Sequence, residues 1–96
     1  MAYLYPFTKV DEETKRAVWE KGRKIQDFDP KDWRYDICGT PMHYADHGNR
    51  DAKYGWEIDH IKPESDGGTD DLSNLRPLQW YNNATKSDDR LTCPIK

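Results

Sequence analysis

The sequence of 96 residues lacks a long hydrophobic run, an internal repeat and any low-complexity tract. A helix that crosses a bilayer needs about 20 consecutive apolar residues, so we expect no association with a membrane. A chain of this length fits one domain. We therefore expect residues 1–96 to form a single small domain, whose modest core limits its stability.

Hydrophobic residues and positive net charge are also scarce. Only 34% of the residues are hydrophobic, 34% are charged, and the formal net charge is -3. Four Trp and six Tyr nevertheless offer large burial per residue, which favours a folded domain over a disordered chain. The negative charge argues against a protein that coats nucleic acid. It does not exclude a metal-dependent nuclease, because such an active site itself needs acidic groups.

Cysteine is scarce as well, with only Cys38 and Cys93 in the chain. These two residues allow one disulfide. Because the sequence shows no signal peptide, we expect a cytoplasmic protein that keeps both thiols reduced.

The first third of the chain predicts an aromatic arm followed by a helix. Residues 1–7 are apolar and contain a proline, and Thr8 or Asp11 is suited to cap a helix that runs to about Ile25. Acidic residues at the start of this helix and basic residues at its end follow the order that the helix dipole favours. We assign residues 1–33 to this N-terminal arm and helix.

The remaining pattern predicts short strands, a long loop and a second helix, in a core unit of about residues 34–88. Its elements in chain order are strands at 34–37, 42–46, 54–61 and 75–78, and a helix from Trp80 or Tyr81 to about residue 88. Pro77 cannot donate to a sheet ladder, which indicates an edge strand or a very short ladder. We expect residues 89–96 to form a loose tail.

The second half of the chain contains polar side chains in an unusual order. Asp59 and His60 end an apolar strand, and a Gly-Gly loop follows. Asn74 precedes the next strand, and Asn83 and Lys86 lie near the start of the expected helix. Taken singly, these residues are a surface carboxylate, a structural histidine, a turn residue and a helix cap. Together, a carboxylate, an imidazole and two amides in this order are typical of a one-metal site that cuts phosphodiester bonds.

This order resembles the HNH endonuclease motif, and more closely its His-Asn-Asn variant, in which the last His is replaced by Asn. The resemblance is strong over residues 54–88 and weaker over residues 33–53. It implies a ββα-metal core (the ββα-metal finger), and it says little about the N-terminal helix. We expect an α+β fold in which that helix packs beside the core. The resemblance also implies an endodeoxyribonuclease whose products carry 5′ phosphate and 3′ hydroxyl groups.

The resemblance assigns roles to individual residues. His60 is similar to the general base, which takes a proton from a water molecule in line with the scissile bond. Asp59 and Asn83 are similar to the metal ligands. Asn74, which the resemblance groups with His60 as catalytic, is similar to the middle Asn, whose amide ties the loop and holds the backbone of His60.

One carboxylate and one amide oxygen leave most coordination positions to water and phosphate, which is the pattern expected of one Mg²⁺ or Mn²⁺ ion.

Adjacent residues on a regular strand point to opposite faces. Asp59 and His60 therefore reach one site only if strand pairing stops at about His60 or Ile61. Three basic residues are candidates for contacts with DNA phosphates, and they are equally well explained as solvated surface charges: Lys62, Arg76 and Lys86.

The sequence departs from many HNH proteins because it lacks their two Cys-x-x-Cys zinc pairs. Cys38 begins such a pair, but the position three residues on is Pro41, and Gln79 and Asn82 stand where the second pair would fall. We therefore expect no structural zinc, and we expect the tryptophan and tyrosine between Gln79 and Asn82 to pack as a staple instead. A substitute zinc site matches no established spacing, and it would use Cys38, His43, His47 and Cys93.

If that zinc site does not form, His43 and His47 are surface or hairpin residues. A further alternative is that His47 faces the active site from the loop that precedes the 54–61 strand. The sequence as a whole predicts a divalent-metal-dependent endonuclease that cuts DNA, as a monomer or a homodimer. A double-strand cut by one small site needs a dimer or successive nicks.

Two other classes of function stay open. One is a catalytically idle module of the same fold that binds nucleic acid, which the joint presence of the four motif side chains opposes. The other is a protein-interaction domain with a zinc staple, which the missing cysteine pairs oppose.

Overall fold

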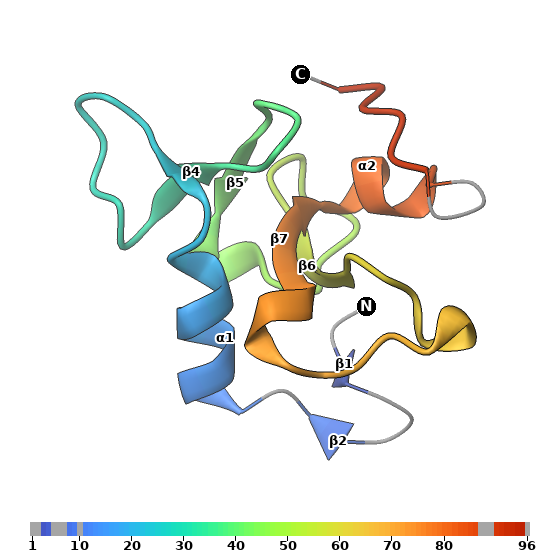
Figure 1. Cartoon of the computed structure of the whole chain (residues 1–96). Helices are drawn as coiled ribbons and strands as arrows, with labels where there is room; N and C mark the ends of the chain where they lie inside the picture. Colours follow the sequence, from blue (N-terminus) through green and yellow to red (C-terminus); the bar gives the residue numbers. More distant parts are fainter. Residues whose placement is uncertain (1–2, 5–7, 10, 87–89, 96) are drawn as a thin grey trace.

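The computed structural model describes residues 3–4, 8–9, 11–86 and 90–95, which form a small α+β structure (Figure 1). Its strands form three antiparallel sheets. The first pairs β1 (Tyr3–Leu4) with β2 (Thr8–Lys9), the second has the order β3 (Arg23–Lys24), β4 (Trp33–Tyr35), β5 (Pro41–His43), and the third pairs β6 (Trp56–His60) with β7 (Leu75–Gln79). Within these residues, no helix has the length and apolar character needed to cross a membrane.

The first helix, α1 (Glu12–Trp19), begins where the sequence predicts and ends earlier. Asp11 is the cap, and its side chain accepts a hydrogen bond from the Thr14 amide at 2.7 Å. The helix does not continue to Ile25, because the chain turns after Trp19 and forms β3. Gly22 lies just after this turn, and an added Cβ there would lie 3.1 Å from both the Arg34 Cβ and the Tyr35 carbonyl oxygen of β4. A side chain at this position would therefore crowd β4.

The core packs aliphatic side chains around two large tryptophans. Trp19 packs on Trp56 with ring centroids 5.0 Å apart and on Tyr44 at 5.2 Å. The buried cluster joins α1, β5, β6 and β7, and it consists of Val18, Trp19, Met42, Trp56, Ile58 and Leu75. Aromatic burial thus compensates for the low hydrophobic content of the chain.

Strands β6 and β7 carry the predicted motif, and their pairing ends as the sequence predicts. His60 at the end of β6 lies opposite Leu75, and beyond it the Ile61 amide donates to the Asn74 carbonyl at 2.8 Å. Among the described strands β7 pairs only with β6, so Pro77 lies on an edge strand. Figure 1 shows that β7 leads directly into α2 (Trp80–Ala84) and that α1 lies beside β7. The helix does not run to about residue 88 as predicted, because α2 ends at Ala84 with Thr85 as its C-cap.

A buried carboxylate joins the turn after β4 to the start of α2. Asp36 accepts hydrogen bonds from the amides of Cys38 and Thr40 at 2.9 and 2.8 Å through one oxygen. Through its other oxygen it accepts from the Gln79 amide at 3.0 Å and from Asn82 Nδ2 at 3.1 Å. Gln79 and Asn82 stand where a second cysteine pair would fall, so this polar network links the two segments that the zinc pairs would link. We call Asp36, Thr40, Gln79 and Asn82 the Asp36 network.

The expected aromatic staple is therefore not what joins these segments. Trp80 does pack against the neighbouring Tyr81 with centroids 5.5 Å apart, and its indole donates to the Ala52 carbonyl at 2.9 Å. Tyr81, however, is exposed. The link across to the turn after β4 is made by hydrogen bonds to a charged acceptor.

The prediction of two reduced thiols is wrong, because Cys38 and Cys93 form a disulfide with their Cα atoms 5.4 Å apart. The backbone of Ile95 also bonds to Asn82, donating to its Oδ1 at 3.0 Å, and its carbonyl accepts from Asn82 Nδ2 at 3.1 Å and from the Thr40 hydroxyl. A loose tail is therefore not found at Cys93 and Ile95. The two cysteines are 55 residues apart, so no local pattern could show that the fold brings them together.

Candidate active site

Asp59 is a buried carboxylate between two cationic side chains. It lies on β6 opposite Arg76 of β7, whose Nε donates to Asp59 Oδ2 at 2.8 Å. Lys86, just after α2, donates from Nζ to Asp59 Oδ1 at 2.5 Å and to the His60 carbonyl at 3.3 Å. Both oxygens of this carboxylate thus attract cations, and the two partners come from different elements.

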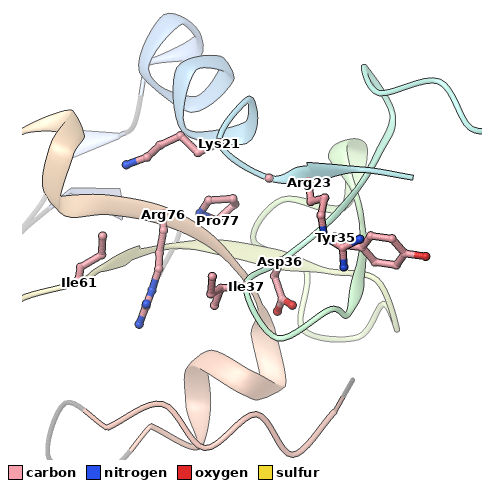
Figure 2. A pocket seen from close by; sticks show the side chains of 9 residues that line it. Lys21, Arg23, Tyr35, Asp36, Ile37, Ile61, Arg76 and Pro77 are labelled. Atoms are coloured by element: carbon pink, nitrogen blue, oxygen red, sulfur yellow. The ribbon is translucent and has the colours of Figure 1, made fainter. Parts of the chain in front are cut away.

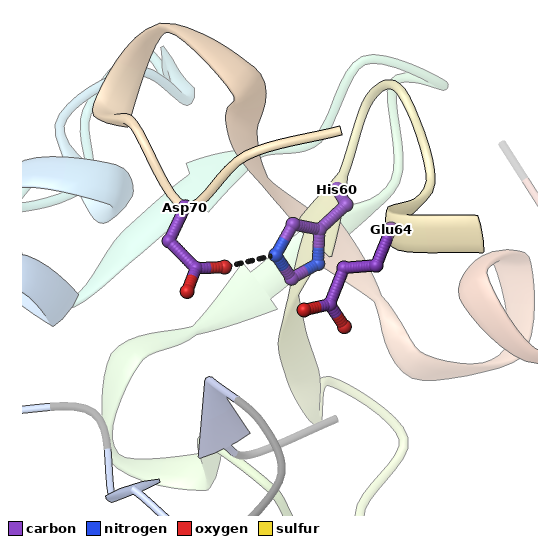
Figure 3. Close-up of side chains that lie close together, drawn as sticks. All are labelled: His60, Glu64 and Asp70. Carbon is purple, nitrogen blue, oxygen red and sulfur yellow. Dashed lines mark hydrogen bonds and ion pairs between the residues drawn. The ribbon is translucent and has the colours of Figure 1, made fainter. Parts of the chain in front are cut away.

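His60 is flanked by two carboxylates of the loop that follows β6. Its Nε2 lies 2.7 Å from Asp70 Oδ1, and the Glu64 carboxylate lies on the other side of the ring (Figure 3). One ligand atom from each of these three residues lies within 4.8 Å of the other two. In the described part of the chain, this is the sole cluster of at least three His, Cys, Asp or Glu residues with metal-binding spacing.

Asp59 and His60 share one surface hollow, although they are neighbours on a strand. The hollow has a volume of about 200 Å³ and is lined by Ile58, Asp59, His60, Pro63, Glu64, Asn83 and Lys86. The end of strand pairing at His60 explains how both side chains reach it. The structure therefore brings together four of the seven predicted site residues in one hollow, namely Asp59, His60, Asn83 and Lys86.

Asn83 lies on α2, and its amide contacts a buried carboxylate that the sequence reading missed. Asn83 Nδ2 donates to Glu57 Oε1 at 2.7 Å. Arg50 holds the same carboxylate from the other side, with Nε 2.6 Å from Oε2 and Nη2 2.9 Å from Oε1. Burial alone would raise the pKa of Glu57, but hydrogen bonds, those from Arg50 and Asn83 among them, lower this pKa to about 2.

Asn74 ties the loop to the backbone just beyond His60. Its Oδ1 accepts from the Lys62 amide at 2.8 Å, and its Nδ2 donates to the carbonyls of Lys62 and Thr69 at 2.9 and 2.8 Å. Gly68 makes this folded loop possible, because a Cβ there would lie 1.8 Å from the Lys62 carbonyl oxygen. The bonds of Asn74 fall on Lys62 and Thr69, and it reaches His60 only through the chain.

The model of the HNH endonuclease family matches residues 36–89, which is more than half of the chain and contains every predicted site residue. The chain belongs to the HNH endonuclease family. No curated protein and no solved structure matches it. Membership indicates a nuclease or nucleic-acid-binding function, with nucleic acid as the partner.

Of the three basic residues predicted to contact phosphates in this HNH chain, two contact Asp59 and one does not. Lys62 is exposed, whereas the side chains of Arg76 and Lys86 are only 20% and 13% exposed because both contact Asp59. Arg76 also lines a second, larger hollow of about 350 Å³ (Figure 2). Other lining residues of that hollow are Lys21, Arg23, Tyr35, Ile37, Ile61 and Pro77.

The other histidines of this HNH chain lie elsewhere. His47 packs on Trp56 with centroids 4.7 Å apart, and its Nε2 is buried without a hydrogen-bond partner. Burial lowers the pKa of His47 to about 4, helped by the positive charge of Lys15. His43 Nδ1 lies 3.3 Å from Asp46 Oδ2. The alternative in which His47 faces the active site is therefore wrong, and the four residues of the substitute zinc site do not come together.

The sequence did not point to four residues that surround the site: Arg50, Glu57, Glu64 and Asp70. One signal for Glu57 was available, since residues two apart on a strand share a face and Glu57 precedes Asp59 by two. Asp70 and Arg50 lie in loops, where only the folded backbone shows which side chains they meet.

Proposed function

We propose that this protein is a divalent-metal-dependent HNH endonuclease that hydrolyses phosphodiester bonds of DNA. In this proposal β6, β7 and α2 form the ββα-metal core, and α1 packs beside it. The observation that carries the proposal is the shared hollow of Asp59, His60 and Asn83, which unites an acid, an imidazole and an amide from a strand end and a helix.

The donor atoms suit a hard divalent cation such as Mg²⁺ or Mn²⁺. The Asp59 carboxylate already attracts two cationic groups, at 2.5 and 2.8 Å. Among the described residues, the Asn83 side chain makes only the bond from Nδ2 to Glu57, which leaves Oδ1 without a donor. An anionic oxygen and a free amide oxygen are ligands that Mg²⁺ and Mn²⁺ accept. When bound, the ion supplies charge neutralisation at the phosphate and at the leaving 3′ oxygen.

His60 is the general base of the proposal. Because an ionised carboxylate only accepts hydrogen bonds, the contact with Asp70 favours the proton on Nε2. The other ring nitrogen, Nδ1, is then the atom that takes a proton from the attacking water. Asn74 acts as a positioning residue, because its bonds to Lys62 and Thr69 hold the loop that carries Asp70 against His60.

Lys62, Arg76 and Lys86 are proposed to contact DNA phosphates. Lys62 is exposed, so its ammonium is available to a phosphate directly. Arg76 and Lys86 reach a phosphate beside Asp59, where incoming negative charge competes for their present ion pairs. Such contacts fix the position of the nucleic-acid backbone without reading its sequence.

The rival function is a catalytically idle module that only binds nucleic acid. The observation that favours it is the set of ion pairs around Asp59 and His60, which satisfies both side chains without a metal. The two functions differ in whether DNA is cut, so they can be separated by one assay.

A plasmid-nicking assay with Mg²⁺, Mn²⁺ and Zn²⁺, and with EDTA, tests the proposal. We expect cleavage with Mg²⁺ or Mn²⁺, none with EDTA, and a loss of about 10²- to 10⁴-fold in rate for His60→Ala. His43→Ala is the matched control and should cut normally, since His43 lies outside the hollow. Cleavage that survives His60→Ala would contradict the proposal, and DNA binding without cleavage under any metal would favour the rival.

A further inference from the structure

Glu57 is a buried carboxylate next to the proposed metal site. It lies two residues before Asp59 on β6, so both carboxylates point from the same face of the strand. Glu57 is only 3% exposed. Arg50 holds it with two hydrogen bonds, of 2.6 and 2.9 Å, in the forked geometry that is strong and directional.

This carboxylate determines which way the Asn83 amide faces. Asn83 Nδ2 lies 2.7 Å from Glu57 Oε1. Arg50 donates to both oxygens of this carboxylate, so Glu57 is an acceptor here and the NH₂ end of the amide faces it. The reversed amide would bring two oxygens to hydrogen-bond distance with no hydrogen between them. The carbonyl oxygen of Asn83 is therefore turned away from Glu57, and among the described residues no donor bonds to it.

We propose that Glu57, held by Arg50, is a positioning residue that fixes the Asn83 amide so that its carbonyl oxygen is presented to the metal. This inference rests on the proposed function, because it assigns Asn83 as a metal ligand. It explains why an amide suits position 83. The NH₂ end of the group donates a hydrogen bond to the carboxylate, and the carbonyl oxygen remains available as a neutral metal ligand.

The first test is the affinity of the DNA-free protein for Mn²⁺, measured by the electron paramagnetic resonance signal of free Mn²⁺. Glu57→Gln keeps the shape of the side chain but offers both a donor and an acceptor, so it no longer selects one amide orientation. We expect Mn²⁺ affinity to fall about tenfold, in the range found for residues that orient metal ligands. Arg50→Gln, at a half-exposed position, should lower it by less, and Arg90→Gln, at an exposed position in the tail, should leave it unchanged.

The second test reverses the hydrogen bond. Asn83→Asp alone brings two carboxylates together at position 57 and position 83, so we expect Mn²⁺ binding and folding to suffer. Combining Glu57→Gln with Asn83→Asp restores one donor and one acceptor, and it leaves a carboxylate oxygen for the metal. We expect the double variant to bind Mn²⁺ within about threefold of the unmodified protein. A merely structural bond between β6 and α2 would restore the thermal midpoint in the double variant without this recovery of affinity.

Asn83→Ala separates this inference from the proposed function. If Asn83→Ala lowers Mn²⁺ affinity but Glu57→Gln and Arg50→Gln leave it within twofold, the positioning role of Glu57 is overturned and the metal site stands. If Asn83→Ala has no effect on Mn²⁺ affinity, then Asn83 is not a ligand and both proposals fail. Recovery in the double variant supports both.

Discussion

Asn82 and Asn83 are neighbours on α2, but they belong to two regions that differ in how completely their side chains are hydrogen-bonded. Asn82 is completely buried, and its amide bonds to Asp36, Thr40 and Ile95 through both its nitrogen and its oxygen. Asn83 uses its nitrogen for Glu57, and its oxygen bonds to no described residue. A fully satisfied amide holds a scaffold together, whereas an amide with a free oxygen retains the capacity to bind something else.

The two central carboxylates differ in the same way. Asp36 accepts four hydrogen bonds from N–H groups, three of them on the backbone, whose positions are fixed by the fold. Asp59 is held by the ends of two long side chains, Arg76 and Lys86. Flexible cations can move away when a metal or a phosphate arrives, but backbone amides cannot. The Asp36 network is thus suited to a structural role, and the surroundings of Asp59 are suited to exchange of partners.

The largest effect on folding is expected when the Asp36 network loses its acceptor. Asp36→Ala leaves four donors without their charged partner, and we expect the free energy of unfolding to fall by about 4 kcal/mol. Chemical denaturation measures this, with the exposed Asp51→Ala as control, for which we expect a change below about 0.5 kcal/mol. A loss under about 1 kcal/mol for Asp36→Ala would show that the network does not join the two segments.

Substitution of the two neighbouring amides is expected to change stability by an intermediate amount, and it compares the two regions directly. Asn82→Ala should lower the free energy of unfolding by about 2 kcal/mol, because it leaves buried groups unpaired, while folded protein keeps its Mn²⁺ affinity. Asn83→Ala should cost less than about 1 kcal/mol and should weaken Mn²⁺ binding. Denaturation curves and metal titrations on both variants check this pair. Equal losses of stability and of affinity in the two variants would refute the division into two regions.

The smallest effect concerns the dependence of stability on pH, and it arises at His47, whose Nε2 is buried. The pKa of His47 is lowered to about 4 in the folded protein, against an ordinary value of 6.5, so the unfolded chain binds more protons between these values. The free energy of unfolding should therefore fall as pH drops from 6.5 towards 4, by an amount of the order of 1 kcal/mol from this residue. Above pH 6.5 the contribution is constant.

Denaturation at pH 7 and pH 5 measures this dependence. His47→Phe keeps a ring against Trp56 but cannot titrate, so its stability should fall less between the two pH values than that of the unmodified protein. His43→Gln is the control and should retain the contribution of His47. An identical pH dependence with and without His47→Phe would show that this buried ring does not resist protonation.

Parts of this fold that depend on local pattern could be predicted from the sequence. Alternating apolar residues mark β6, Asp11 marks the start of α1, and the motif residues mark the hollow. The end of α1 at Trp19 could not be predicted, because the chain leaves the helix to form β3, whose partner β4 comes later in the sequence. The disulfide and the Asp36 network join residues distant in the chain. Each of their members, read alone, is an ordinary cysteine, aspartate or amide.

The alternation along β6 limits how this protein can change. Trp56 and Ile58 belong to the buried core, while Glu57 contacts Asn83 and Asp59 lines the hollow, so one strand serves both purposes. A substitution that changes the packing on the core face of β6 will also move the side chains on its opposite face. Altered metal preference at the proposed site is therefore easier to reach through position 83, on a short helix that contributes no residue to the buried cluster, than through any position on the strand.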